Sequence, residues 1–112
     1  MTVRYGEYPL PMDYEDEALD NLIDKYISEK KSNAADFTYR GICLWLFRIA
    51  SNEGRLKKEN DTVYDNPIMT YDDEIRISKL LWNRIWDKKI FINFSHNEYS
   101  SHYVNDTSFS IL

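Results

Sequence analysis

The chain has few of the residue types and motifs that mark catalytic, cofactor-binding or metal sites. It contains one cysteine, three glycines, three prolines and two histidines in 112 residues. A single cysteine excludes an internal disulfide, and three scattered glycines exclude a glycine-rich phosphate loop. No nucleophile elbow, Cys-x-x-Cys or His-Glu-x-x-His motif is present. These absences predict a protein that is not an enzyme and has no cofactor or metal.

Long apolar runs are also absent. No stretch approaches the roughly 18 apolar residues that a membrane-spanning helix needs. The first residues lack the apolar segment of a secretory signal peptide. We therefore expect a cytoplasmic protein without a membrane partner. Its length is sufficient to bury a core, which predicts a single domain over residues 1–112.

The chain lacks the excess of basic residues that is typical of nucleic-acid-binding proteins. The net charge is −5. Residues 1–36 carry nine acidic and four basic side chains, and this difference equals the whole net charge. Such a balance disfavours phosphate-rich partners and favours a protein partner with a basic surface.

Three segments have the apolar spacing of amphipathic helices, and their expected bounds are 14–31, 34–53 and 71–88. Capping residues support these bounds: Asp13 for the first helix, Ser32 or Asn33 for the second and Thr70 for the third. Gly54 suits the position just after a helix. The third helix has a wide apolar face that includes Trp82 and Trp86.

The most apolar run is Gly41–Ala50, in the middle of the second predicted helix. Its only charged residue is Arg48. A helix that is apolar on nearly every side must be covered on nearly every side, so we expect it at the centre of the fold. We expect Arg48 either to extend its head to solvent or to pair with carboxylates of the first helix.

From Ile90 onward the apolar period changes from 3.6 to 2, which predicts strands. The expected strands are 89–95, 98–104 and 107–112, forming a C-terminal three-stranded antiparallel meander with the helices on its apolar face. The predicted fold class is therefore α+β. Elsewhere, Thr2–Tyr5 has the composition of an edge strand, and the polar connector 55–69 has room for a short strand at Thr62–Tyr64.

The first predicted helix carries acidic residues at helical spacing, away from its apolar face. The row consists of Asp13, Asp16, Glu17, Asp20 and Asp24. One interpretation is a docking face for a positively charged groove, including mimicry of nucleic-acid phosphates. The other is a solvated face whose charges match the helix dipole.

Our leading hypothesis is an acidic interaction protein that binds a macromolecule with a basic surface. Inhibition of that partner is a further hypothesis that the residues leave open. The acidic row would attract the partner and exposed tyrosines would anchor it. One alternative is a winged-helix-like nucleic-acid binder that uses the third helix and the turn Ser95–Glu98. The predicted exposed side of that helix carries Arg76, Lys79, Asn83 and Asp87. The connector of about fifteen residues before that helix opposes this alternative. A small enzyme using His96 or His102 is the remaining hypothesis.

Overall fold

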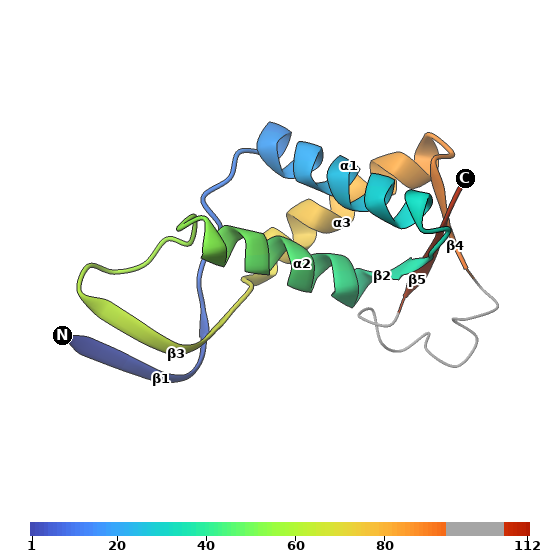
Figure 1. Cartoon of the computed structure of the whole chain (residues 1–112). Coiled ribbons are helices and arrows are strands. Elements are labelled where there is room, and N and C mark those ends of the chain that lie inside the picture. Colours follow the sequence, from blue (N-terminus) through green and yellow to red (C-terminus); the bar gives the residue numbers. More distant parts are fainter. Residues whose placement is uncertain (94–106) are drawn as a thin grey trace.

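The computed structural model describes residues 1–93 and 107–112, and it confirms the predicted α+β class. Three helices pack together in the centre, with one small sheet at each end of the molecule (Figure 1). The helices are α1 (Asp16–Ser32), α2 (Tyr39–Asn52) and α3 (Tyr71–Trp86). The strands are β1 (Thr2–Pro9), β2 (Phe37–Thr38), β3 (Thr62–Ile68), β4 (Ile90–Ile92) and β5 (Ser108–Ile111). Within the described residues, no helix is long and apolar enough to cross a membrane.

The helix boundaries agree with the predictions except at the start of α2. Predicted segments 14–31 and 71–88 correspond closely to α1 and α3. The prediction that the second helix begins near residue 34 is wrong. Thr38 caps it instead, because its side-chain oxygen accepts a 3.0 Å hydrogen bond from the Gly41 amide. Residues 34–38 are free to form a turn and the strand β2.

Of the predicted N-terminal caps of the other two helices, one is confirmed and one is wrong. Thr70 caps α3 as expected, with its hydroxyl accepting a 3.2 Å bond from the Asp73 amide. Asp13 does not cap α1, because Glu15 occupies the cap position and makes no capping bond. Gly54 follows the end of α2 with a φ of +69°, a conformation that glycine adopts without the steric cost of a side chain.

The antiparallel sheet differs in composition from the predicted meander. β4 and β5 lie within the predicted strands 89–95 and 107–112 and pair antiparallel, with Ile92 opposite Phe109. The predicted strand 98–104 lies outside the described residues. The second neighbour of β5 is β2, which comes from between α1 and α2, so the sheet order is β2-β5-β4. The rings of Phe37 in β2 and Phe109 in β5 stack, with their centroids 5.2 Å apart. This contact explains why the two-residue strand β2 joins the sheet.

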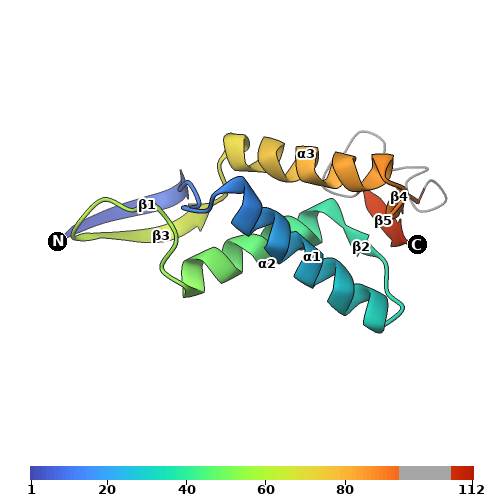
Figure 2. The same ribbon diagram turned by 90° about the horizontal axis from the view of Figure 1, so that it is seen from above.

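The second sheet is an arm made of β1 and β3, and it extends from the helices at the end opposite β4 and β5 (Figures 1 and 2). The strands are parallel, with Thr2 opposite Thr62 and Pro9 opposite Ile68. The connector 55–69, which we expected to be largely a loop, therefore contains a seven-residue strand. Helices α1 and α2 both lie between the paired strands in the sequence, so periodicity within each segment gave no indication of this pairing.

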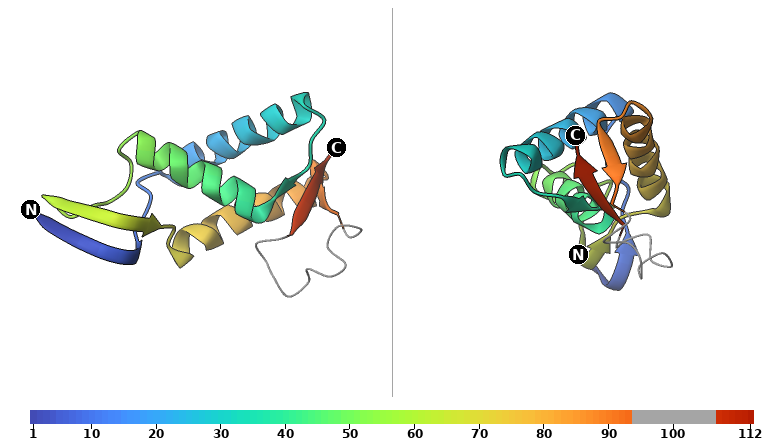
Figure 3. Two further views of the ribbon diagram at one scale, coloured as in Figure 1. Left: turned by 60° about the horizontal axis from the view of Figure 1, so that its bottom comes forward. Right: turned by 90° about the vertical axis from the view of Figure 1, so that its right-hand side faces the viewer.

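The core lies where the three helices meet each other and the antiparallel sheet (Figure 3). Helix α2 contributes one line of buried side chains to the core, namely Tyr39, Ile42, Leu46 and Ala50. The expectation that Gly41–Ala50 is covered on nearly every side is wrong, because Leu44 is 54% exposed. Arg48 is also exposed and makes no ion pair with any described residue.

A buried carboxylate joins the N-terminal segment to α3. Asp73 is buried, and its Oδ2 accepts a 2.8 Å hydrogen bond from the Met12 amide. Its Oδ1 accepts a 2.9 Å bond from Nη1 of Arg76, one turn later in the same helix. The carboxylate thus satisfies a backbone donor in the core while a neighbouring cation compensates its charge.

We predict that Asp73→Ala lowers the free energy of unfolding by about 2–4 kcal/mol, because it leaves the Met12 amide without its buried acceptor. Asp72→Ala is the matched control, since Asp72 is the adjacent acidic residue and is exposed. Urea denaturation followed by circular dichroism measures both variants. Equal midpoints for the two variants would contradict the role assigned to Asp73.

Candidate functional site

Of the acidic row predicted from the sequence, the three members Asp16, Asp20 and Asp24 pair with α3. Asp16 Oδ1 lies 2.9 Å from Nε of Arg76. One and two turns later, Asp20 and Asp24 lie 2.8 and 2.6 Å from the two terminal nitrogens of Arg84. These contacts align α1 and α3 side by side in the same chain direction. Three of the five carboxylates therefore have an intramolecular partner.

Arg84 is the most strongly engaged of these groups. Its side chain is 8% exposed, although it carries a full charge. Besides the two carboxylates, its guanidinium donates to the backbone carbonyls of Leu80 and Asp20 at 3.0 and 3.1 Å. A buried cation with this many acceptors holds its position because breaking the set leaves a charge without compensation.

Arg84 had no role in the predictions from the sequence, and Arg76 was predicted on the exposed side of the third helix. A signal was available, because the two arginines are eight residues apart, and so are Asp16 and Asp24. Matching periods on two helices indicate facing rows of opposite charge. Pairing with α1 also neutralises two cations that a DNA-reading α3 would need, which weakens the winged-helix alternative.

The two remaining members of the row are free of ion pairs. Asp13 and Glu17 are exposed, and neither carboxylate contacts a cation among the described residues. Asp13 is held through its backbone, whose carbonyl accepts a 2.9 Å bond from Nε of Arg55. Electrostatic attraction of a partner by this row would therefore depend mainly on its N-terminal end.

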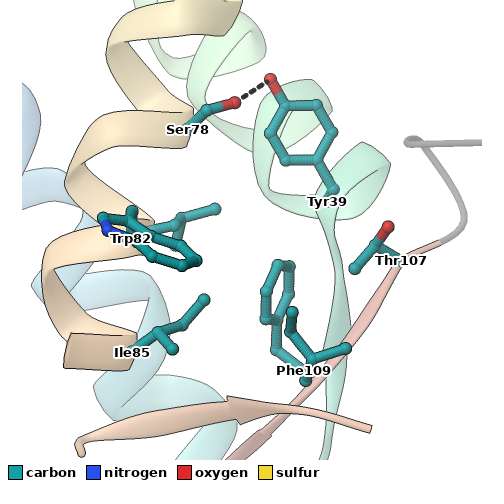
Figure 4. A pocket seen from close by; sticks show the side chains of 8 residues that line it. Tyr39, Ser78, Trp82, Ile85, Thr107 and Phe109 are labelled. Carbon is teal, nitrogen blue, oxygen red and sulfur yellow. Dashed lines mark hydrogen bonds between the residues drawn. The ribbon is translucent and has the colours of Figure 1, made fainter. Parts of the chain in front are cut away.

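A cleft of about 170 Å³ opens between α3 and the antiparallel sheet. In Figure 4, Trp82 and Ile85 of α3 lie on one side, with Phe109 of β5 on the other. Tyr39, at the start of α2, closes one end. The full lining consists of Tyr39, Ser78, Leu81, Trp82, Ile85, Ile92, Thr107 and Phe109. A dry apolar cavity of roughly 150 Å³ accommodates a benzene molecule, so this cleft has room for one apolar side chain.

The polar groups at the end of the cleft already have partners. Ser78 donates a 3.0 Å hydrogen bond to the Tyr39 hydroxyl (Figure 4). The Tyr39 hydroxyl in turn donates a 2.8 Å hydrogen bond to the backbone carbonyl of Glu74. Burial raises the pKa of the Tyr39 hydroxyl well above its ordinary value. This hydroxyl is therefore neutral and fixed at physiological pH, which suits it to shape the cleft rather than to transfer protons.

Two tryptophans of α3 are exposed, and the first of them, Trp82, lines the cleft. Trp82 and Trp86 are one turn apart on α3, and their exposed fractions are 58% and 77%. Phe91 of β4 is exposed as well. The sequence placed both tryptophans on the apolar face of this helix, but that face is wider than the surface that α1, α2 and the sheet cover.

Among the residues that the structure describes, the other reactive side chains do not assemble a site. Burial raises the pKa of the Cys43 thiol to about 12 from an ordinary value of 9.0, so it remains protonated at neutral pH. Within residues 1–93 and 107–112, no group of histidine, cysteine and carboxylate side chains could hold a metal. His96 and His102, considered as acid–base residues from the sequence, lie outside these ranges.

Comparisons with known proteins found no match to the chain among protein-family models, curated proteins or solved structures. A functional interpretation therefore depends on the residues themselves. Two surface features can carry it, namely the apolar cleft with its exposed tryptophans and the partly paired acidic row.

The pairing of the acidic row predicts unequal effects of charge reversal along α1. Asp24→Lys should lower the free energy of unfolding by about 1–2 kcal/mol, because it removes a charge-assisted bond and places a cation against Arg84. Glu17→Lys makes the same charge change two turns earlier and should cost less, about 0.3–1 kcal/mol, because it removes only the attraction between a first-turn carboxylate and the helix dipole. Urea midpoints test this difference, and equal losses would mean that the α1–α3 pairs contribute nothing specific.

The raised pKa of Cys43 predicts slow reaction with thiol reagents. A pKa of about 12 instead of 9.0 lowers the thiolate fraction at pH 8 by about a thousandfold. Ellman's reagent should therefore label the native protein much more slowly than the urea-unfolded chain. The native rate should keep rising with pH beyond pH 9, and a plateau near pH 9 would contradict the assignment.

Proposed function

We propose that this chain binds another protein, and that the cleft beside Trp82 receives an apolar side chain of that partner. The observation that carries the proposal is the exposure of Trp82, which lines an apolar cleft of side-chain size, together with that of Trp86 one turn later on the same helix. Tryptophan is enriched among residues that dominate binding energy, especially where a pocket lies beside it. An exposed aromatic patch of this kind marks an interaction surface more often than an inert one.

The net charge of −5 favours a partner segment whose apolar anchor is flanked by basic residues. Asp13 and Glu17 supply free carboxylates for attraction over a distance, while Asp16, Asp20 and Asp24 are partly neutralised by their arginines. Mimicry of nucleic-acid phosphates loses part of its basis for this reason. Binding would inhibit the partner if the partner's basic surface also contains its active site or its own binding site.

The proposal is one of binding and not of catalysis. Hydroxyl groups of Tyr39, Ser78 and Thr107 line the cleft, and those of Ser78 and Tyr39 are bonded to each other, with Tyr39 also bonded to the backbone. The only cysteine of the chain is held protonated. A cytoplasmic location is part of the proposal, because an unpaired cysteine suits a reducing compartment. Nucleic-acid binding by α3 has less support, because Arg76 and Arg84 are committed to α1.

We predict that Trp82→Ala and Trp86→Ala together weaken partner binding by about thirtyfold or more, the loss typical of interface hot spots. Tyr71→Ala is the matched control, because Tyr71 is a similarly exposed aromatic residue at the first position of the same helix. Affinity capture from cell extract compares the parent and both variants, and titration calorimetry with the captured protein then measures affinity.

The expected result is a protein captured by the parent and by Tyr71→Ala but lost with the double tryptophan variant. Circular dichroism should show unchanged helix content in all three, since the substituted side chains are exposed. Equal capture by all three proteins would reject the cleft as the binding surface. Loss in both variants would place the interface along α3 outside the cleft.

A further inference from the structure

The β1–β3 arm has properties that a parallel strand pair rarely shows in isolation. Val3 and Tyr5 of β1 and Val63 of β3 are exposed, Tyr5 to 80%. Parallel strands occur mostly in sheets that are covered on both faces. A two-stranded sheet is also marginal in water, and three or more strands are normally needed for stability. The arm therefore has the character of half of a larger sheet.

Its two free edges are not equivalent. β3 carries Asp65 and Pro67, and an edge with a charge and a proline resists further strand pairing. β1 has its only proline at its last residue, Pro9. No helix runs along the side of β1 opposite to β3 in Figures 1 and 3. The β1 edge is thus the one available to another strand.

The sequence of β1 is complementary to itself when two copies are aligned antiparallel. Placing Arg4 opposite Glu7 of the second copy also places Glu7 opposite its Arg4. In the same register Tyr5 lies opposite Gly6, and Val3 opposite Tyr8. Opposite charges, an aromatic ring over glycine and an aromatic–β-branched pair are all favourable cross-strand combinations. A shift by one residue in either direction removes both charge pairs.

The bulge in β1 makes this register geometrically accessible. In a regular strand, residues of opposite parity direct their backbone groups to opposite edges, so Arg4 and Glu7 could not pair across one edge. In β1 the register shifts between these residues: Arg4 is opposite Tyr64, whereas Glu7 is opposite Asn66. The one extra residue restores the same backbone direction at both positions, with Gly6 at a φ of +79° within the bulge.

We propose that two copies of this chain dimerise by antiparallel pairing of their β1 strands. The product is a four-stranded sheet of order β3-β1-β1-β3, with a two-fold axis between Tyr5 and Gly6. The interface is isologous and closed, because the outer β3 edges are blocked by Asp65 and Pro67. Glu7 is available for the new ion pair, since it pairs with no cation among the described residues.

Sedimentation velocity from micromolar to near-millimolar concentration tests the proposal with the full chain. The parent should shift from monomer to dimer within this range. Arg4→Glu and Glu7→Arg should each weaken dimerisation by about tenfold or more, because each variant places like charges opposite one another twice. An equimolar mixture of the two variants should dimerise again, because every Glu then faces an Arg. The double variant Arg4→Glu/Glu7→Arg should behave as the parent does.

Arg4 also lies 3.4 Å from Glu59 within the chain, so a control must separate the two contacts. Glu59→Gln removes the internal ion pair and should leave dimerisation unchanged. If a single variant loses structure, the mixture and the double variant still decide the question. A parent that stays monomeric, or single variants that dimerise as well as the parent, would overturn the proposal. A monomeric parent would leave the β1 edge to a segment of another protein.

Discussion

The contact between α1 and α3 through Arg84 determines how the rest of α3 is presented. The guanidinium of Arg84 is almost fully buried and binds two carboxylates and two backbone carbonyls. These bonds fix the rotation of α3 about its axis and its position along that axis. With Arg84 facing α1, Leu81 enters the core and Trp82 lies beside the cleft. Because the arrangement is set by charge as well as by packing, α3 cannot rotate to hide its tryptophans without exposing an uncompensated cation.

The surface consequently reverses the usual division between charged and apolar side chains. Asp16, Asp20 and Asp24 form ion pairs within the chain, which partly neutralise their charges. Two of the largest apolar side chains, Trp82 and Trp86, are exposed. Folded proteins expose much apolar area, but two adjacent tryptophans are costly to leave in water without a function. In the proposed function, the partly neutralised row would attract a basic partner, and the tryptophans would supply the apolar contact area that charge attraction alone does not provide.

Local patterns in the sequence were sufficient for the three helices and for strands β4 and β5, since each has a clear apolar period. They failed where a partner is distant: β1 pairs with β3 across about sixty positions, and β2 joins β5 across about seventy. The start of α2 was misplaced because several polar residues before it can cap a helix. Spacing placed Asp16, Asp20 and Asp24 correctly along one face of α1, but Asp13 lies before the helix begins. Spacing within α1 also could not identify Arg84 as the partner of Asp20 and Asp24.

The pairing of β1 with β3 has a consequence for the order of folding. Residues 2–9 can meet residues 62–68 only after the chain between them, including α1 and α2, has become compact. Closing so long a loop is slow, whereas the helices form from local contacts. The arm is therefore expected to assemble late and to open independently of the helices, so that its amide hydrogens exchange with solvent well before those of α2.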